Sequence, residues 1–122
     1  MSNLPSINEK ELLPYFDRVD IIEQTIEQIK KDFDPFRLEI QSPDGDENFY
    51  QRLFSQVEPF ILKLIKDNYR ELLQVLYRID VNEKKISESV NNSSAAGLSS
   101  EIARLVIFRE LQKVVIRNYY KS

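Results

Sequence analysis

Four cationic side chains recur at every fourth position near the C-terminal end of the sequence, which is the spacing of one helical face. They are Arg109, Lys113, Arg117 and Lys121. Such a row can track the phosphates of a nucleic acid or another anionic surface, and nearby tyrosines can stack on bases. The same spacing is typical of the solvent face of an amphipathic helix, where cations near the C-terminus also favour the helix dipole. Because the chain carries a net charge of −3 and most nucleic-acid-binding domains are basic, we favour the solvated face and keep anion binding as the alternative.

A second cluster of charges is acidic and includes Asp44, Asp46 and Glu47. A calcium loop of the EF-hand type that begins at Asp44 requires glycine at its sixth position and glutamate at its twelfth. The sequence has Phe49 and Ser55 at those positions. We therefore interpret the cluster as a turn followed by the acidic residues that favour the start of a helix.

The residues used most often in catalysis are missing or rare in this chain. It contains no histidine and no cysteine, and only two glycines. These absences exclude thiol nucleophiles, serines activated by histidine and histidine-containing metal pairs in a helical bundle. The sequence also has no glycine-rich phosphate loop. We predict a protein that is not an enzyme and holds no cofactor or metal, and a metal-dependent enzyme that uses carboxylates alone is the remaining catalytic alternative.

The spacing of apolar residues predicts an all-α fold, a compact bundle of four to five helices. A first helix is expected over about residues 15–33, where apolar residues recur at alternating steps of three and four, and a short turn of helix over 6–13 precedes it. A long central segment over 46–79 carries Pro59, which predicts a bend, and 67–68 is a second position for a break. A short helix over 81–90 and a last helix from Ser99 or Ser100 to about Tyr120 complete the bundle.

Two segments do not follow the helical pattern. Residues 36–40 alternate between apolar and polar side chains, which predicts a short extended segment. It either lies across the bundle or pairs with the same segment of a second copy, and a short helix capped by Asp34 is the third alternative. Residues 91–100 are rich in asparagine, serine and alanine and carry no charge, which predicts a mobile internal linker within a single helical domain over 1–122.

The last helix is apolar around much of its circumference, which is typical of either a central helix or an interface helix. The candidate interface residues are Leu105, Val106, Ile107, Val114 and Ile116. Residues 1–61 hold six basic and thirteen acidic side chains, whereas residues 62–122 hold eleven and seven, so the two halves can complement each other within one fold or across a dimer. We hypothesise a non-enzymatic interaction or assembly protein that binds a protein partner or forms a homodimer.

The expected location is the cytoplasm, without insertion into a membrane. No stretch approaches the ~18 apolar residues of a spanning helix, and the N-terminus has neither the basic start nor the apolar core of a secretory signal. Segments 76–80 and 109–113 resemble stretches of small bacterial proteins. This resemblance implies a bacterial origin and no particular activity.

Overall fold

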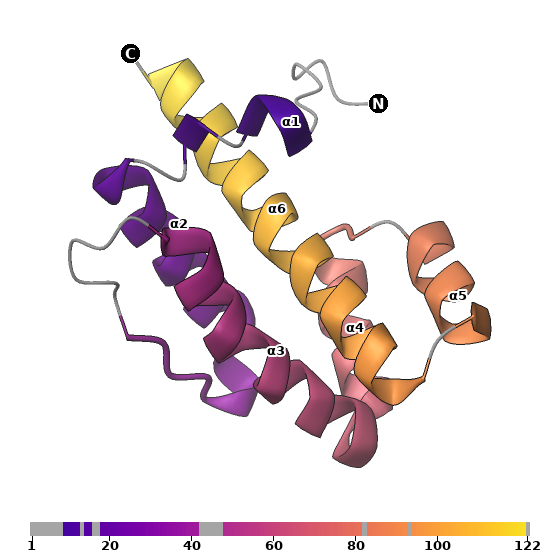
Figure 1. Ribbon diagram of the computed structural model, residues 1–122. Helices are drawn as coiled ribbons and strands as arrows, with labels where there is room; N and C mark the ends of the chain where they lie inside the picture. Colours follow the sequence, from indigo (N-terminus) through magenta and orange to yellow (C-terminus); the bar gives the residue numbers. More distant parts are fainter. Residues whose placement is uncertain are drawn as a thin grey trace.

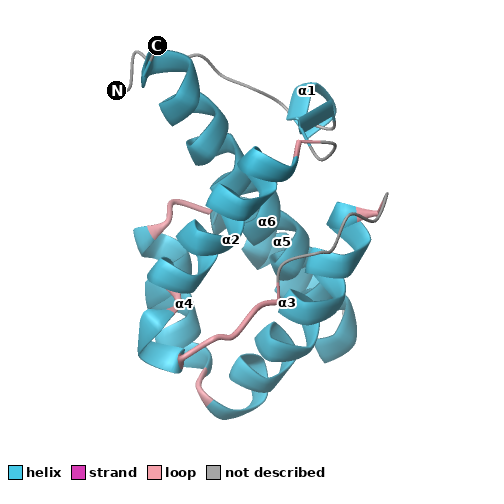
Figure 2. Ribbon diagram, turned by 90° about the vertical axis from the view of Figure 1, so that its left-hand side faces the viewer, coloured by secondary structure: helices cyan, strands magenta, loops and turns pink. Residues whose placement is uncertain are grey.

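The computed structural model describes residues 9–12, 14–15, 18–41, 48–81, 83–92 and 94–121. Within these ranges the chain contains helices and connecting segments but no strand, which confirms the all-α prediction (Figure 1, Figure 2). Six α-helices are described, against the four to five expected. They are α1 (Glu9–Leu12), α2 (Val19–Asp32), α3 (Phe49–Asp67), α4 (Tyr69–Arg78), α5 (Glu83–Asn92) and α6 (Ala95–Lys121).

The long helix α6 lies at the centre of the bundle. Helices α1, α2, α3 and α5 all contact it, and Figure 1 shows α6 crossing the middle of the molecule between α3 and α5. Residues from several sides of α6 are fully buried, among them Ile102, Ala103, Val106, Ile107, Leu111 and Val114. The apolar circumference of the last helix therefore reflects its central position within one chain.

The segment that carries Pro59 packs alongside α6. Helix α3 continues through Pro59, although the proline ring removes one backbone hydrogen bond from the helix. The break comes instead at Asn68, which ends α3 and precedes α4, and this is the second of the two positions expected from the sequence. Because of this break, α4 does not continue along the line of α3 (Figure 1).

The residues after α2 lie across α3 of the same chain. A single 3-10 turn, η2 (Asp34–Phe36), is followed by a segment without regular structure. In this segment Leu38 and Ile40 are buried and their neighbours are exposed, as the alternating pattern predicts. The Gln56 side chain of α3 accepts a hydrogen bond from the Gln41 amide and donates one to the Gln41 carbonyl. The Gln56 side chain thus pairs with both backbone polar groups of Gln41, as a neighbouring strand would otherwise do.

Most of the expected linker over 91–100 belongs to helices. Helix α5 ends at Asn92, and α6 begins at Ala95, four residues before the expected start at Ser99. The Ser94 side chain accepts a hydrogen bond from the Gly97 amide, so a residue that indicates a loop by composition instead caps a helix.

Candidate functional site

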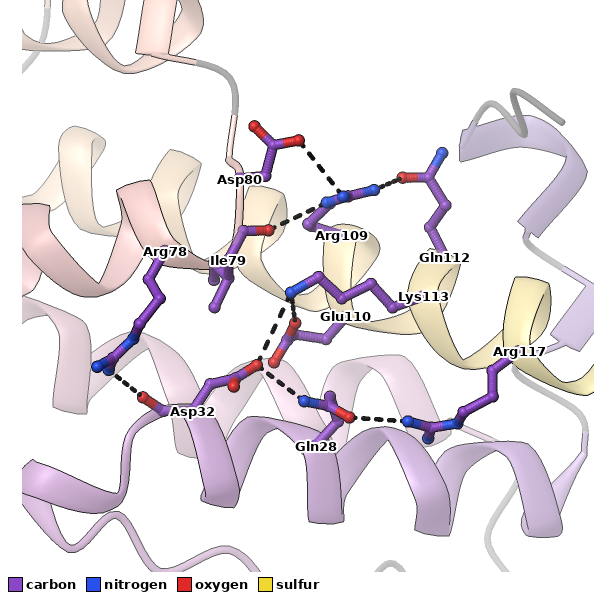
Figure 3. A network of polar contacts seen from close by, with 10 residues as sticks. All are labelled: Gln28, Asp32, Arg78, Ile79, Asp80, Arg109, Glu110, Gln112, Lys113 and Arg117. Atoms are coloured by element: carbon purple, nitrogen blue, oxygen red, sulfur yellow. Dashed lines mark hydrogen bonds and ion pairs between the residues drawn. The ribbon is translucent and has the colours of Figure 1, made fainter. Parts of the chain in front are cut away.

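Three cations of the row on α6, Arg109, Lys113 and Arg117, contact other parts of the same chain (Figure 3). Arg109 Nε donates to the carbonyl of Ile79 at 3.1 Å, and Nη1 donates to Gln112 Oε1 at 2.7 Å. Its Nη2 lies 3.4 Å from Asp80 Oδ2. Asp80 adopts a left-handed backbone conformation with φ of 65°, which is uncommon for a residue other than glycine. Arg109 therefore fixes the turn that follows α4.

The next two cations connect α6 to α2. Lys113 Nζ lies 3.2 Å from Glu110 Oε1 and 3.9 Å from Asp32 Oδ2. Arg117 Nη1 donates to Gln28 Oε1 at 3.1 Å, and Gln28 Nε2 donates in turn to Asp32 Oδ2 at 3.0 Å. Figure 3 shows these side chains as one continuous polar network between the two helices. Both cations are thus engaged within the chain.

Arg117 is the exposed member of the row, and its surroundings are acidic. It borders a hollow of about 550 Å³ along α2. The hollow is lined by Asp20, Glu23, Gln24, Glu27, Gln28, Lys31 and Arg117. An anion that approached Arg117 would meet the three carboxylates of this lining, which oppose its binding. The side chain of Lys121 lies outside the described residues.

Glu110 is the only buried acidic side chain in the part of the chain that the structure describes, with an exposed fraction of 0%. Its carboxyl group contacts Asp32 and forms an ion pair with Lys113, and no other described group donates a hydrogen bond to its oxygens. Burial raises the pKa of Glu110 to about 8, and the neighbouring Asp32 acts in the same direction, while Lys113 opposes the shift. The carboxyl group is therefore mostly protonated at neutral pH.

The pKa of Asp32, the last residue of α2, shifts in the opposite direction. Burial is the largest single influence and raises the pKa of Asp32. The hydrogen bonds with Glu110 and Gln28 and the charges of Lys113 and Arg78 together outweigh it, so the pKa lies below its usual value. Arg78 Nη2 also donates to the main-chain carbonyl of Asp32 at 3.1 Å. Two neighbouring carboxyls with opposite shifts behave as a pair that holds one proton.

The search for catalytic motifs in the sequence missed Glu110 because the residue lies within no motif. A signal was present in the helical spacing. Ile107, Leu111 and Val114 are all fully buried, and Glu110 lies three residues after the first, beside the second and four residues before the third. A residue at that position shares the buried face of the helix, so a carboxylate there must be buried with its neighbours.

The five candidate interface residues lie in the core of the single chain. The exposed fractions are 7% for Leu105, 0% for Val106, 0% for Ile107, 0% for Val114 and 8% for Ile116. Because α1, α2, α3 and α5 cover α6, these residues form no open surface in this arrangement. A partner could reach them only if the bundle opened.

A small apolar surface is instead left on α4. Leu73 and Tyr77 lie about one turn apart on this helix and have exposed fractions of 38% and 75%. Arg70, three residues before Leu73, is also exposed and has no ion pair with any described residue. The three residues share one helical face, which we call the α4 stripe. The opposite face of α4 is buried through Leu72, Val75 and Leu76.

Known proteins offer no guide to this chain. It matches no protein-family model, no curated protein and no solved structure. Among the described residues, no three histidine, cysteine, aspartate or glutamate side chains gather where they could hold a metal ion. The same part of the chain contains no helix that is both long enough and apolar enough to span a membrane. Function must therefore be argued from the polar network and the exposed surface.

Proposed function

We propose that the protein is a non-enzymatic helical interaction protein that binds a partner protein through the α4 stripe. One observation carries the proposal: Leu73 and Tyr77 stay exposed on α4, whereas the candidate interface residues of α6 are covered by their own chain. Tyrosine and arginine are enriched among the residues that dominate binding energy at protein interfaces. The stripe combines both with a leucine on one face of a helix.

Arg70 suggests the chemistry of the partner. Its guanidinium has no carboxylate partner among the described residues, and it lies one turn before the apolar pair. A partner helix with an acidic side chain about one turn from an apolar one would pair with Arg70 and cover Leu73 and Tyr77. The small size of the stripe fits a transient complex. We propose the cytoplasm of a bacterial cell as the place of this interaction.

The other two hypotheses have less support. Anion binding by the row on α6 would compete with the internal contacts of Arg109 and Lys113. An enzyme that uses carboxylates to hold a metal ion has no group of donors to support it among the described residues.

Site-specific crosslinking in cells tests the proposal. A photo-crosslinking amino acid placed at Leu73 is expected to yield a product of defined mass. The same residue placed at Glu23, which is exposed on α2, is expected to yield none. Arg70→Glu should abolish the product from position 73, because it replaces the attractive charge with a repulsive one. Equal products from both positions, or a product that survives Arg70→Glu, would contradict the proposal. A product of twice the chain's mass would identify a second copy as the partner.

A further inference from the structure

The C-terminal end of α2 is joined to α6 by charged side chains inside the bundle. We call Asp32, Glu110 and Lys113 the Glu110 cluster (Figure 3). Among the described residues, Lys113 is the only ammonium in contact with both carboxyls, at 3.2 Å from Glu110 and 3.9 Å from Asp32. One partly buried cation is thus shared by two acidic groups.

The charged groups in and around the cluster come from three helices, and those that act on Glu110 itself come from α2 and α6. Helix α2 contributes Asp32, and α6 itself contributes Lys113. Helix α4 contributes Arg78, which acts on Asp32 through its charge and through the bond to the Asp32 carbonyl. Arg78 is exposed, so solvent screens its charge more than that of the buried groups.

The number of protons in the cluster sets its charge. With a proton on Glu110, Asp32 and Lys113 form a neutral pair. Without it, two carboxylates compete for one ammonium, and the buried carboxylate of Glu110 has no described donor besides Lys113. A buried, incompletely paired charge is costly, and water relieves that cost when a neighbouring element moves aside.

The element coupled to the cluster is the end of α2. Asp32 is its last helical residue, and Ile29 and Phe33 beside it are fully buried, so separating this turn from α6 is a local opening that the core resists. A carboxylate at a helix C-terminus also opposes the helix dipole, and this end therefore depends on its contacts with Arg78, Gln28 and the cluster.

We propose that the Glu110 cluster is a proton-controlled latch between α2 and α6. With Glu110 protonated, the last turn of α2 stays docked on α6. Loss of the proton releases that turn and admits water to Glu110. This device does not depend on the function proposed for the α4 stripe.

Hydrogen exchange of backbone amides, measured on the full chain by NMR, tests the latch. Protection factors for residues 28–32, corrected for intrinsic exchange, should fall by about tenfold or more between about pH 6 and about pH 9. Glu110→Gln should remove this fall, because the amide keeps the shape of the side chain and cannot ionise. Glu101→Gln, on the same helix but partly exposed, should keep the fall seen in the unaltered protein.

A second readout follows Glu110 directly and needs no substitution. The ¹³C shift of its carboxyl carbon should titrate near neutral to mildly alkaline pH, together with the loss of protection in α2. The latch is overturned if the carboxyl titrates in the ordinary acidic range. It is equally overturned if protection in α2 does not change with pH, or if the change persists in Glu110→Gln.

Discussion

Helices α6 and α4 both carry apolar residues beyond what one buried face requires, but they differ in what covers them. Four helices surround α6, so its candidate interface residues form the core of one chain. Helix α4 lies at the edge of the bundle, and Leu73 and Tyr77 stay exposed on its outer face. The wide apolar circumference of α6 is thus enclosed by the chain along most of the helix, and Tyr119 near its end is exposed.

Charging the centre of α6 is the strongest test of this difference. Ile107→Glu combined with Val114→Glu places two carboxylates at fully buried positions. Each buried charge costs several kcal/mol, and together they exceed the marginal stability of a small domain, so the chain should unfold. Circular dichroism should show the loss of helix. A folded variant that has lost only a binding partner would restore the interface interpretation of α6.

The next largest effect on stability is expected from Glu110, a buried acidic residue of α6. Its pKa rises from 4.5 to about 8 on folding, so the folded protein binds more protons than the unfolded chain between these values. The free energy of unfolding should therefore fall as pH rises through this window, by at most about 1.4 kcal/mol per pH unit. Urea denaturation at several pH values measures the slope. Glu110→Gln should flatten it, and an unchanged slope in that variant would assign the effect to another group.

The lowered pKa of Asp32 gives a dependence of stability on pH that has the opposite sign. Its contribution to stability is present above its unfolded pKa and is lost as pH falls through the folded value. Stability should therefore decline again in acid, and Asp32→Asn should reduce that decline in the same urea series. The two carboxyls together predict a maximum of stability at mildly acidic pH.

A smaller effect is expected at Ser99, the other buried polar residue of α6. Its hydroxyl lies within hydrogen-bond distance of two acceptors, the Glu58 carboxylate of α3 and the carbonyl of Ala96, and donates to one of them at a time. Ser99→Ala leaves Glu58 without this partner and should cost about 1 to 2 kcal/mol in urea denaturation. Ser100→Ala, at an exposed position, is the matched control and should leave stability nearly unchanged.

The smallest change in stability is expected on the α4 stripe. Leu73→Ser and Tyr77→Ser alter exposed side chains, so each should shift the free energy of unfolding by no more than about 0.5 kcal/mol. Each should nevertheless weaken crosslinking from a probe at Gln74, which is exposed beside the stripe and leaves Arg70 in place. A large loss of stability would mean that these side chains belong to the core.

Local patterns predicted the fold better than they predicted the site. Apolar spacing indicated the helices, and the alternation around Leu38 and Ile40 indicated which of those residues are buried. The start of α6 was misplaced because serines there cap and pack within a helix instead of forming a loop. The environment of Glu110 depends on Asp32, which lies far away in the sequence and reaches it only through tertiary packing. A local sequence pattern does not predict a contact between residues so far apart in the chain.

The most direct test of the account is urea denaturation of the purified protein at protein concentrations about a hundredfold apart. The core on α6 closes within one chain, so the midpoint should be the same at both concentrations. If the residues of α6 were instead buried between copies, unfolding would be coupled to dissociation and the midpoint would rise with concentration. A clear rise, retained in Leu73→Ser, would contradict the central claim that α6 is a core helix.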